Sequence, residues 1–370
     1  MNIVKNKGIS NLLFSTLPAR IRARLNIVHS VYESRRNSWG KGFVGNCELV
    51  RRGGHETYNS NELPFNGGRK EMSYPMRFVY AVKNAVVSLR RGRICAGGRW
   101  LGESFGNPYG AASEVFCYKF FSWCTKLFCR TVHLPPNDNG YIFCRYDGYF
   151  HFVVESMVTL LYSLKVHPNA SVIVRKKDYE NSRYFRDYID ILKEQGKIRN
   201  LQIVDADLAA ADKLVFAAYE PDAGMICKES VGLLVETFGK ELAIEGKRRV
   251  FLTRKGRRRF DNQEEIEKIL AISGFEVIDA ESLSVREQMD VFRTSSFIVS
   301  NHGAGLTNLL WTHSGTVVIE LFSHKWLNDC YFRLASIKGL RYRSLVAKES
   351  NGWGIVDCQK LQKIIEGEYV

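Results

Sequence analysis

The sequence predicts an α/β protein built from two parallel-sheet units that join near residues 240–248. From residue 141 onward, short apolar segments alternate with longer segments whose apolar residues recur at helical spacing, which is the pattern of strand–helix–strand units. The chain has 370 residues, which is too long for one ordinary hydrophobic core and enough for two. We therefore expect two Rossmann-like halves, with ligands bound at the carboxyl ends of their strands.

The first unit is expected over residues 41–240. Its predicted strands lie at 77–88, 141–145, 171–175, 201–204 and 213–217, and its predicted helices at 149–164, 181–194 and 229–242. The regular alternation after residue 141 indicates parallel strands. Most of residues 41–140 carry Gly-rich turns and clustered aromatics that indicate no particular topology.

The second unit is expected over residues 241–346, followed by a C-terminal tail or helix at 347–370. Its predicted strands lie at 249–253, 275–278, 297–300, 316–321 and 341–346, and two short helices at 306–311 and 329–338. Two more helices are predicted to begin with capping boxes, at Asp261-x-x-Glu264 and Ser284-x-x-Glu287. In a capping box the first side chain and the later glutamate each accept a hydrogen bond from the other's backbone N–H.

Residues 1–40 form a separate basic segment. The net charge of the chain is +14, and residues 1–41 hold eight basic residues against one acid. Leu17, Ile21 and Leu25 recur there at helical spacing, with arginines between them. A basic amphipathic helix of this kind can dock on an anionic membrane surface, but the same pattern fits a helix packed against the body of the protein.

Composition also restricts the cellular location and the binding partners that we expect. No segment reaches the roughly 18 uninterrupted apolar residues of a membrane span, and the N-terminus lacks a signal-peptide pattern. Nine cysteines without CxxC spacing indicate reduced thiols, so we expect a cytoplasmic protein, peripheral at the inner membrane face where the basic segment docks. No RNP, zinc-finger or helix-turn-helix pattern occurs, so nucleic acid is not an expected partner.

The most informative motif is a glycine-containing loop between a predicted strand and a short helix. It consists of Asn301, His302, Gly303, Ala304, Gly305, Leu306, Thr307 and Asn308. The two glycines allow a ligand to approach the backbone, and the free N–H groups at the helix start favour an anion. Thr307 and Asn308 add side-chain donors. A purely structural turn would need similar glycines, so that alternative stays open.

Two charged residues follow neighbouring strands of the same unit. Arg254 comes after the strand at 249–253, where its guanidinium can grip a diphosphate with two hydrogen bonds. Glu320 ends the strand after the glycine loop, where a carboxylate can accept hydrogen bonds from the hydroxyls of a ribose. A solvated acid at a strand end is the alternative for Glu320.

His151 and Glu155 lie four residues apart in an otherwise apolar predicted helix. Two ionisable groups on one apolar face are costly unless they are paired or used, so they are candidates for a general base and its orienting partner. A locally satisfied His–Glu pair is the alternative.

Metal sites are not expected. Asp205 and Asp207 resemble the DxD motif of metal-dependent sugar transferases, but acidic pairs after a strand are common in turns. His302, His313 and His324 do not match a zinc spacing. We therefore predict neither a metal nor any other cofactor.

Three motifs together resemble glycosyltransferase family 61. Asn301-His302-Gly303-Ala304-Gly305-Leu306-Thr307-Asn308 followed by Gly315–Leu321 is similar to the signature of that family, whose bacterial members include capsular polysaccharide biosynthesis proteins. Tyr149–Glu155 resembles its second motif, and Leu252-Thr253-Arg254 resembles its strand-end arginine. The resemblance covers residues 141–346.

The resemblance implies a GT-B fold, in which two Rossmann-like domains face a central cleft. It implies metal-independent transfer, with inversion, from a nucleoside-diphosphate sugar, with a UDP-sugar as the expected donor. His302, Gly303, Gly305, Thr307 and Arg254 would line the diphosphate, Glu320 would hold the ribose, and His151 or Glu155 would deprotonate the acceptor hydroxyl. The acceptor would be a glycan or a lipid-linked glycan of a capsule or O-antigen.

Two other functions compete with this interpretation. A Rossmann-type oxidoreductase would carry GxGxxG in its first strand–helix turn, and the sequence has none. A non-catalytic protein of the same fold that binds a nucleotide or a polysaccharide is not excluded by sequence.

Overall fold

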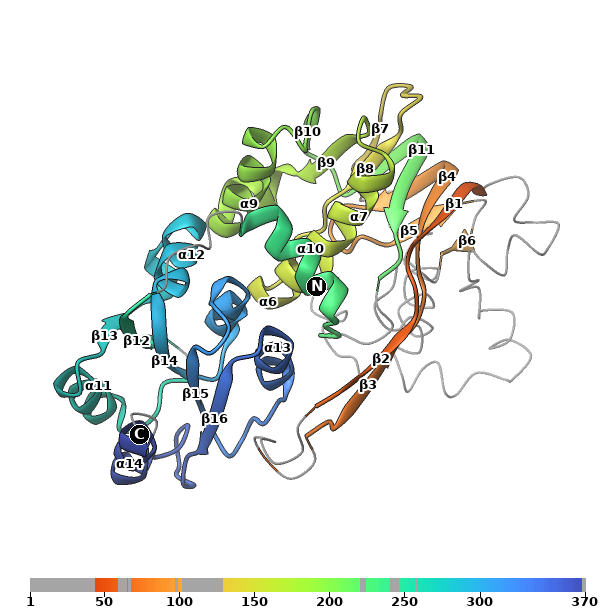
Figure 1. Cartoon of the computed structure of the whole chain (residues 1–370). Helices are drawn as coiled ribbons and strands as arrows, with labels where there is room; N and C mark the ends of the chain where they lie inside the picture. Colours follow the sequence, from red (N-terminus) through yellow and green to blue (C-terminus); the bar gives the residue numbers. More distant parts are fainter. Residues whose placement is uncertain are drawn as a thin grey trace, which may run out of the picture. The chain divides into compact units, whose positions relative to one another are not determined.

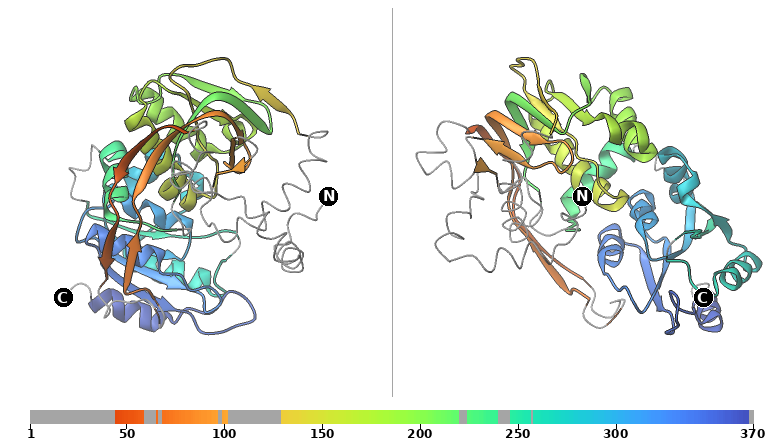
Figure 2. Two further views of the ribbon diagram at one scale, coloured as in Figure 1. Left: turned by 90° about the vertical axis from the view of Figure 1, so that its right-hand side faces the viewer. Right: turned by 180° about the vertical axis from the view of Figure 1, so that it is seen from behind.

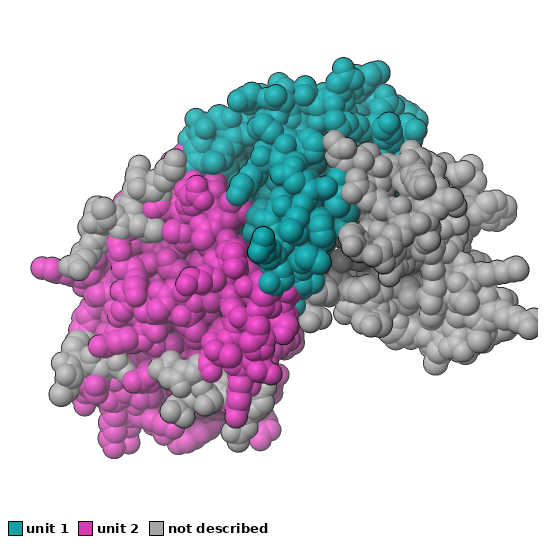
Figure 3. Space-filling model, turned by 45° about the vertical axis from the view of Figure 1, so that its right-hand side comes forward, with its two compact units in different colours: residues 1–53, 75–147, 155–225 teal, residues 54–74, 148–154, 226–370 magenta. Residues whose placement is uncertain are grey.

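The computed structural model describes residues 44–58, 65, 68–96, 99–101, 129–219, 224–239, 246–256 and 258–367. The predicted basic segment at 1–40 lies outside the described residues. The chain divides into two compact units, coloured separately in Figure 3. Unit 1 comprises residues 1–53, 75–147 and 155–225, and unit 2 comprises residues 54–74, 148–154 and 226–370.

Unit 1 is built on a nine-stranded mixed sheet, shown in Figure 1. Its main strand order is β10-β9-β8-β11-β4-β5-β6, while β1 pairs with β4 and β7 pairs with β11. The strands are β1 (Val44–Arg51), β4 (Arg77–Ser88), β5 (Ile94–Ala96), β6 (Arg99–Trp100), β7 (Thr131–His133), β8 (Tyr141–Phe143), β9 (Ser171–Arg175), β10 (Leu201–Val204) and β11 (Leu208–Ala217).

The expectation of a parallel first unit is only half right. Strands β8, β9 and β10 are parallel, and β11 is parallel to β8. However, β11 pairs antiparallel with β4 over nearly its whole length, from Leu208–Ser88 to Ala217–Val79, and β1 and β5 also pair antiparallel with β4. The long apolar strand β4 therefore joins the parallel half of the sheet to an antiparallel half.

The helices after β8 differ from the prediction in one respect. The predicted helix 149–164 consists of α6 (Tyr149–His151), a π-helical segment η4 (Phe152–Met157) and α7 (Val158–Val166). The division between the two units falls inside η4, between Val154 and Glu155. Wide π-helical turns often occur at functional sites. The other helices of unit 1 are α8 (Lys176–Asn181) and α9 (Arg183–Glu194).

Unit 2 contains a parallel five-stranded sheet of order β13-β12-β14-β15-β16. The strands are β12 (Arg248–Leu252), β13 (Glu276–Ile278), β14 (Ser295–Asn301), β15 (Val317–Phe322) and β16 (Arg341–Val346). The helices are α10 (Lys228–Phe238), α11 (Gln263–Ile272), η5 (Ala280–Ser282), α12 (Val285–Arg293), η6 (Ala304–Trp311), α13 (Cys330–Lys338) and α14 (Cys358–Gly367).

Helices cover both faces of the unit 2 sheet. On one face α11 and α14 pack together over a core that includes Phe251, Val299 and Ile319, and Figure 2 shows these two helices from behind. Four further helices, α6, α10, α12 and α13, contact η6. This three-layer arrangement confirms the predicted α/β class for this half of the chain.

A hairpin distant in sequence belongs to unit 2. It consists of β2 (Gly54–Thr57) and β3 (Glu71–Tyr74), whose core residues include Met72 and Tyr74. The backbone N–H of Arg69 donates to Asp329, and the ring of Tyr58 contacts that of Phe332 at 6.1 Å. The hairpin therefore anchors on α13 and on the turn before it.

One predicted capping box is present and the other is wrong. Ser284 and Glu287 exchange both hydrogen bonds of the motif at the start of α12. Helix α11 instead begins after Asn262, without a side-chain cap. Asp261 accepts hydrogen bonds from the Ser350 hydroxyl and the Trp353 backbone N–H, because the loop after β16 competes for its carboxylate.

None of the helices within the described residues combines the length and the apolar character needed to cross a membrane.

Candidate functional site

The candidate site lies in unit 2, at the carboxyl ends of β12, β14 and β15. The Asn301–Asn308 loop leaves β14 and becomes η6, and Arg254 follows β12 after one intervening residue. Parallel neighbouring strands end at the same edge of a sheet, which is where ligands of such sheets bind. The structure brings Arg254 against this loop, since its guanidinium lies 3.5 Å from the carbonyl oxygen of His302.

The start of η6 presents free backbone donors. The N–H of His302 is bound to Leu321 O at 2.8 Å, and the N–H of Leu306 to Gly303 O at 3.0 Å. Between them, the N–H groups of Gly303, Ala304 and Gly305 have no acceptor among the residues that the structure describes. Unsatisfied N–H groups at a helix start can bind an anion. The geometry is therefore compatible with the anion site that the sequence predicts for this loop.

Gly303 leaves room for the Arg254 guanidinium. Its φ of 169° is ordinary extended backbone, but a Cβ atom there would lie 2.8 Å from the Arg254 Cζ. The guanidinium thus occupies the place that a side chain would fill. At Gly305 a Cβ would meet only ordinary contacts, with Leu252 and Ala280, so the backbone there is open on its outer side.

The environment of the Arg254 guanidinium disfavours its positive charge. Its half-buried position lowers its pKa, and the nearby charge of Arg258 lowers it further. An arginine pKa has ample margin above neutral pH, so the side chain stays a cation. Its charge is poorly hydrated and poorly paired, which favours an anionic ligand.

His302 is held by a buried carboxylate. Its Nδ1 lies 2.5 Å from Glu320 Oε1, and the Tyr342 hydroxyl donates to Glu320 Oε2 at 2.5 Å. Burial raises the pKa of Tyr342, with the charge of Glu320 as the next cause, so the phenol keeps its proton and can donate it. A carboxylate only accepts, so the Nδ1 of His302 carries a proton and its Nε2 is left for another partner.

The expected contact between Glu320 and a ribose is not supported by this arrangement. Glu320 is 0% exposed, and both of its oxygens are engaged. The reason is that β15 continues two residues beyond it, to Phe322, so Glu320 lies inside the sheet beside Ser344 rather than at its end. Its position makes it a support for His302.

Aromatic rings that the sequence did not single out surround His302. The Phe322 ring stacks on the imidazole, with centroids 5.0 Å apart and planes 24° apart, and Tyr331 lies at 5.5 Å. Phe65, from the β2–β3 hairpin, contacts Phe322 at 5.9 Å. No motif marks these rings, because they come from three separate segments that only folding brings together.

Asn308 is also a support residue rather than a ligand contact. Its side-chain oxygen accepts from the Tyr149 hydroxyl at 2.7 Å and the Trp311 indole at 3.1 Å. Its side-chain nitrogen donates to Gln288 at 2.8 Å and to Gly305 O at 3.1 Å. These four contacts use both donor and both acceptor positions of the amide, and Asn308 is 0% exposed. The side chain therefore has no free donor for a diphosphate, contrary to the prediction.

Two other polar side chains of the loop differ from Asn308. The Asn301 nitrogen donates to Gln263 at 2.9 Å, but its buried oxygen Oδ1 lacks a hydrogen-bond partner among the described residues. The buried hydroxyl of Thr307 lies within hydrogen-bonding reach of Tyr331. A buried polar atom without a partner is rare and calls for an explanation such as a bound water or ion. Leu306 is buried in the apolar interior and can contribute only its backbone.

His151 belongs to the same unit as the loop. Its neighbours along the chain anchor the short helix α6 on unit 2, since Tyr149 donates to Asn308 and Phe150 contacts Tyr331 at 5.4 Å. Tyr331 in turn contacts His302. The structure therefore places His151 on a helix fixed to η6, with its side chain partly exposed.

Glu155 lies in unit 1 and has other partners. Its Oε1 accepts from the Gly224 N–H at 2.7 Å, and its Oε2 lies 3.5 Å from the guanidinium of Arg145. Arg145 also binds Asp147 at 2.7 Å and covers the ring of Tyr219 at 4.5 Å. Glu155 is therefore a buried member of an ion-pair cluster, which gives it a structural role.

The DxD-like pair also has protein partners. Asp205 lies 3.0 Å from Arg130, and Asp207 lies 3.5 Å from Arg175. Across the part of the chain that the structure describes, no three His, Cys, Asp or Glu side chains come together as metal ligands.

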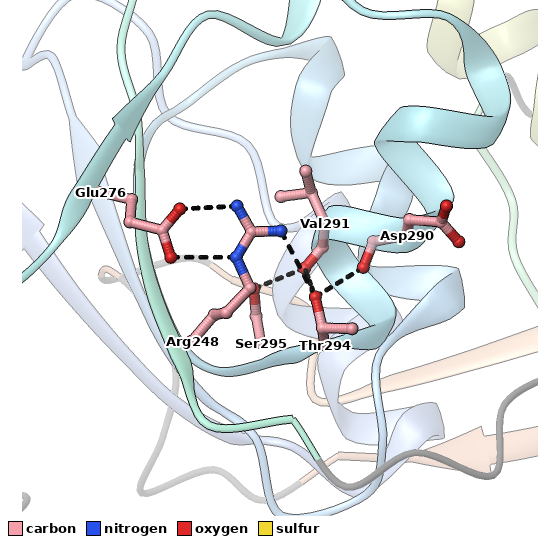
Figure 4. Close-up of polar contacts among 6 residues, drawn as sticks. All are labelled: Arg248, Glu276, Asp290, Val291, Thr294 and Ser295. Atoms are coloured by element: carbon pink, nitrogen blue, oxygen red, sulfur yellow. Dashed lines mark hydrogen bonds and ion pairs between the residues drawn. The ribbon is translucent and has the colours of Figure 1, made fainter.

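A hollow of about 480 Å³ lies at the opposite edge of the unit 2 sheet, beside the first residues of β12 and β14. Figure 4 shows its central contact, in which Arg248 binds Glu276 through two hydrogen bonds of 2.9 and 2.6 Å and also reaches Thr294. The Arg248 guanidinium is thus neutralised within the protein, unlike Arg254 at the candidate site.

Comparison with known proteins agrees with the motifs at this site. The family model described as Glycosyltransferase 61 matches residues 149–319. This region is therefore similar to a glycosyltransferase 61 domain. The match begins at Tyr149, two residues before His151, and includes Arg254 and the Asn301–Asn308 loop, which confirms the family resemblance seen in the sequence. It ends one residue before Glu320.

A curated relative supports the same family. The chain is 34% identical over 67 residues to the EGF domain-specific O-linked N-acetylglucosamine transferase of Drosophila melanogaster. The aligned segment covers 18% of this chain and only 13% of the relative.

Proposed function

We propose that the glycosyltransferase 61 domain transfers a sugar, with inversion, from a nucleoside-diphosphate sugar to a hydroxyl group of a glycan acceptor. The observation that carries the proposal is the set of unpaired donors at the start of η6, combined with the poorly paired cation Arg254. A leaving diphosphate gains negative charge, which such fixed donors stabilise.

The proposed reaction uses few groups. The acceptor oxygen attacks the anomeric carbon from the face opposite the leaving group and gives its proton to a base, while the bond from that carbon to the diphosphate oxygen breaks. We assign the base to His151, because both oxygens of Glu155 already have partners in unit 1. His302, held by Glu320, is proposed to direct its Nε2 toward the diphosphate.

The absence of a metal requirement is part of the proposal. The backbone N–H groups of Gly303, Ala304 and Gly305, together with Arg254, would supply the electrostatic stabilisation that a divalent ion supplies in other transferases. The only DxD-like pair, Asp205 and Asp207, lies against arginines in unit 1.

The wider assignments follow from the family. We propose a GT-B arrangement in which unit 2 binds a UDP-sugar and unit 1 faces the acceptor. The acceptor is proposed to be a free or lipid-linked glycan of a bacterial capsule or O-antigen, reached at the inner membrane face through residues 1–40. The fly relative is named for transfer to EGF domains, so a protein hydroxyl is the competing acceptor.

A thermal-shift screen against nucleoside diphosphates and nucleotide sugars, with and without EDTA, tests the function. A ligand at 100 times its Kd should add about 2.7 kcal/mol of stability. Stabilisation by one nucleotide class that persists in EDTA supports metal-free donor binding. Stabilisation that EDTA removes contradicts metal independence. Nucleotide binding without hydrolysis or transfer points to a non-catalytic binding protein, and no binding argues against the donor site.

A further inference from the structure

Two tryptophans and an arginine meet at the same edge of unit 2 as the candidate site. Arg258 follows β12, Trp326 follows β15, and Trp353 follows β16. The Arg258 Cζ lies 5.0 Å from the centroid of the Trp326 ring and 5.8 Å from that of Trp353. We call these three residues the tryptophan platform.

The loops that carry the platform are joined to one another. Lys325 Nζ donates to the carbonyl oxygen of Gly352 at 2.5 Å, and the Trp326 N–H donates to Ser323 O at 3.2 Å, which closes a tight turn. The N–H of Trp353 is held by Asp261 at 3.0 Å. The backbone that presents the two indoles is thus fixed by hydrogen bonds.

The platform is open to solvent. Trp326 is 47% exposed, whereas Trp353 packs partly against the core. Exposed aromatic side chains that lie together are informative, because tryptophan is enriched at binding interfaces. Arg258 adds a second unusual feature, because its φ of 71° lies in the left-handed region that non-glycine residues seldom adopt. Such strained residues cluster at ligand clamps.

The platform is adjacent to the diphosphate donors. Arg258 is four residues from Arg254, and its charge is one of the causes that lower the pKa of Arg254. A nucleoside diphosphate carries an anionic group at one end and a flat aromatic ring at the other, separated by a ribose. Unit 2 offers a cationic loop and an aromatic surface at the same edge of its sheet.

We propose that Arg258, Trp326 and Trp353 bind the nucleobase of the donor, with the base stacked on the Trp326 indole. This inference rests on the proposed donor site and deepens it by naming where the base is recognised. Every nucleobase can stack on an aromatic side chain or a guanidinium plane. The platform would therefore strengthen the binding of a nucleotide without changing the contacts made by its phosphates.

The test compares uridine diphosphate and inorganic diphosphate by isothermal titration calorimetry. Trp326→Ala should weaken the binding of uridine diphosphate about tenfold or more, because the nucleotide has a base that stacks on the indole. The binding of inorganic diphosphate, which has no base, should be unchanged. Trp326→Phe should restore most of the affinity. Ile272→Ala, which removes a residue that is 77% exposed at the end of α11, is the matched control.

The outcomes separate this inference from the proposed function. If wild-type protein binds inorganic diphosphate and uridine diphosphate, but Trp326→Ala weakens neither or weakens both equally, the nucleobase assignment is overturned while the donor site stands. The assignment is likewise overturned if nucleotide affinity is retained and only the KM of a glycan acceptor rises. A wild-type chain that binds neither ligand overturns the donor site and the platform together.

Discussion

Gly303 and Arg254 act as a pair at the centre of the candidate site. Since the guanidinium occupies the space of the missing Cβ, Gly303→Ala should displace it and imitate Arg254→Ala. We expect each substitution to lower kcat by about tenfold to a thousandfold, where the upper part of this interval is the range for losing one preorganised donor. The double variant should lose little more than either single one, because both remove the same interaction. Steady-state kinetics of the three variants measure this coupling.

Arg259→Ala is the matched control, since Arg259 lies in the same loop as Arg254 but is exposed and paired with Glu264 of α11. Near-normal activity of Arg254→Ala would remove Arg254 from the site. Losses that multiply in the double variant would show that Gly303 acts independently of it.

Glu320 is predicted to act on catalysis only through His302. Glu320→Gln retains the shape of the side chain, but a glutamine amide has only one accepting oxygen. It therefore cannot accept hydrogen bonds from both Tyr342 and His302. We therefore expect kcat to fall on the order of tenfold, less than for loss of a donor, with a changed pH profile of kcat. Glu349→Gln, at a side chain that is 87% exposed, serves as control. An unchanged pH profile in a folded Glu320→Gln protein would refute the positioning role.

Sequence patterns predicted which residues come together at the candidate site better than which partners each side chain contacts. The glycine loop and Arg254 were found because free N–H groups at a helix start and a strand-end arginine follow from local order. The roles of Asn308 and Glu320 could not be found in this way. Their partners Tyr149, Gln288 and Tyr342 come from other elements, and only packing determines which side chains are buried together.

At the scale of elements, α11 and α12 show how context overrides a local motif. The capping box of α12 is complete, so Ser284→Ala should lower the free energy of unfolding by about 1 kcal/mol. Asp261→Ala should not weaken the start of α11, since that carboxylate instead holds the loop at Ser350 and Trp353. Urea denaturation measures the first effect. Amide exchange near 350–353, faster in Asp261→Ala than in wild type, measures the second.

The same comparison explains which elements were predictable. Strands β4, β9 and β16 have the predicted bounds, because each is an apolar or alternating segment with clear turn residues beside it. The hairpin of β2 and β3 was not predicted. Its short strands are stabilised by contacts with residues more than 150 positions away, such as Tyr74 with Glu229, which no local pattern encodes.

For the whole molecule, several carboxylates link stability to pH. Hydrogen bonds from Arg248 lower the pKa of Glu276. In the same way, the Ser350 hydroxyl lowers the pKa of Asp261, and the Lys360 N–H lowers the pKa of Asp357. The folded chain then binds fewer protons than the unfolded chain near pH 4. Stability should be fully present above about pH 5 and fall as pH drops through 4, as followed by urea midpoints.

Glu276→Gln tests one contributor to this pH dependence. Its ion pair with Arg248 is half exposed, so we expect a loss of only about 0.5 kcal/mol at pH 7 and a shallower fall below pH 5. Asp212→Asn, at an exposed position in unit 1, should leave the curve unchanged. A Glu276→Gln curve parallel to wild type down to pH 3 would show that this pair does not contribute.

The path of the chain makes unit 2 dependent on segments that precede it. Residues 226–370 alone would lack the hairpin at 54–74 and the segment 148–154. They would lose the Tyr149 partner of Asn308, the Arg69 donor to Asp329 and the buried Met72. Each buried polar group left without its partner costs roughly 1–3 kcal/mol, a large part of a typical total stability of about 5–15 kcal/mol.

We therefore expect the isolated fragment to unfold at a much lower urea concentration than the full chain, and co-expression with residues 1–225 to restore the midpoint. A fragment that unfolds cooperatively at the midpoint of the full chain would show that the donor-binding half is self-sufficient and that the preceding segments serve another purpose.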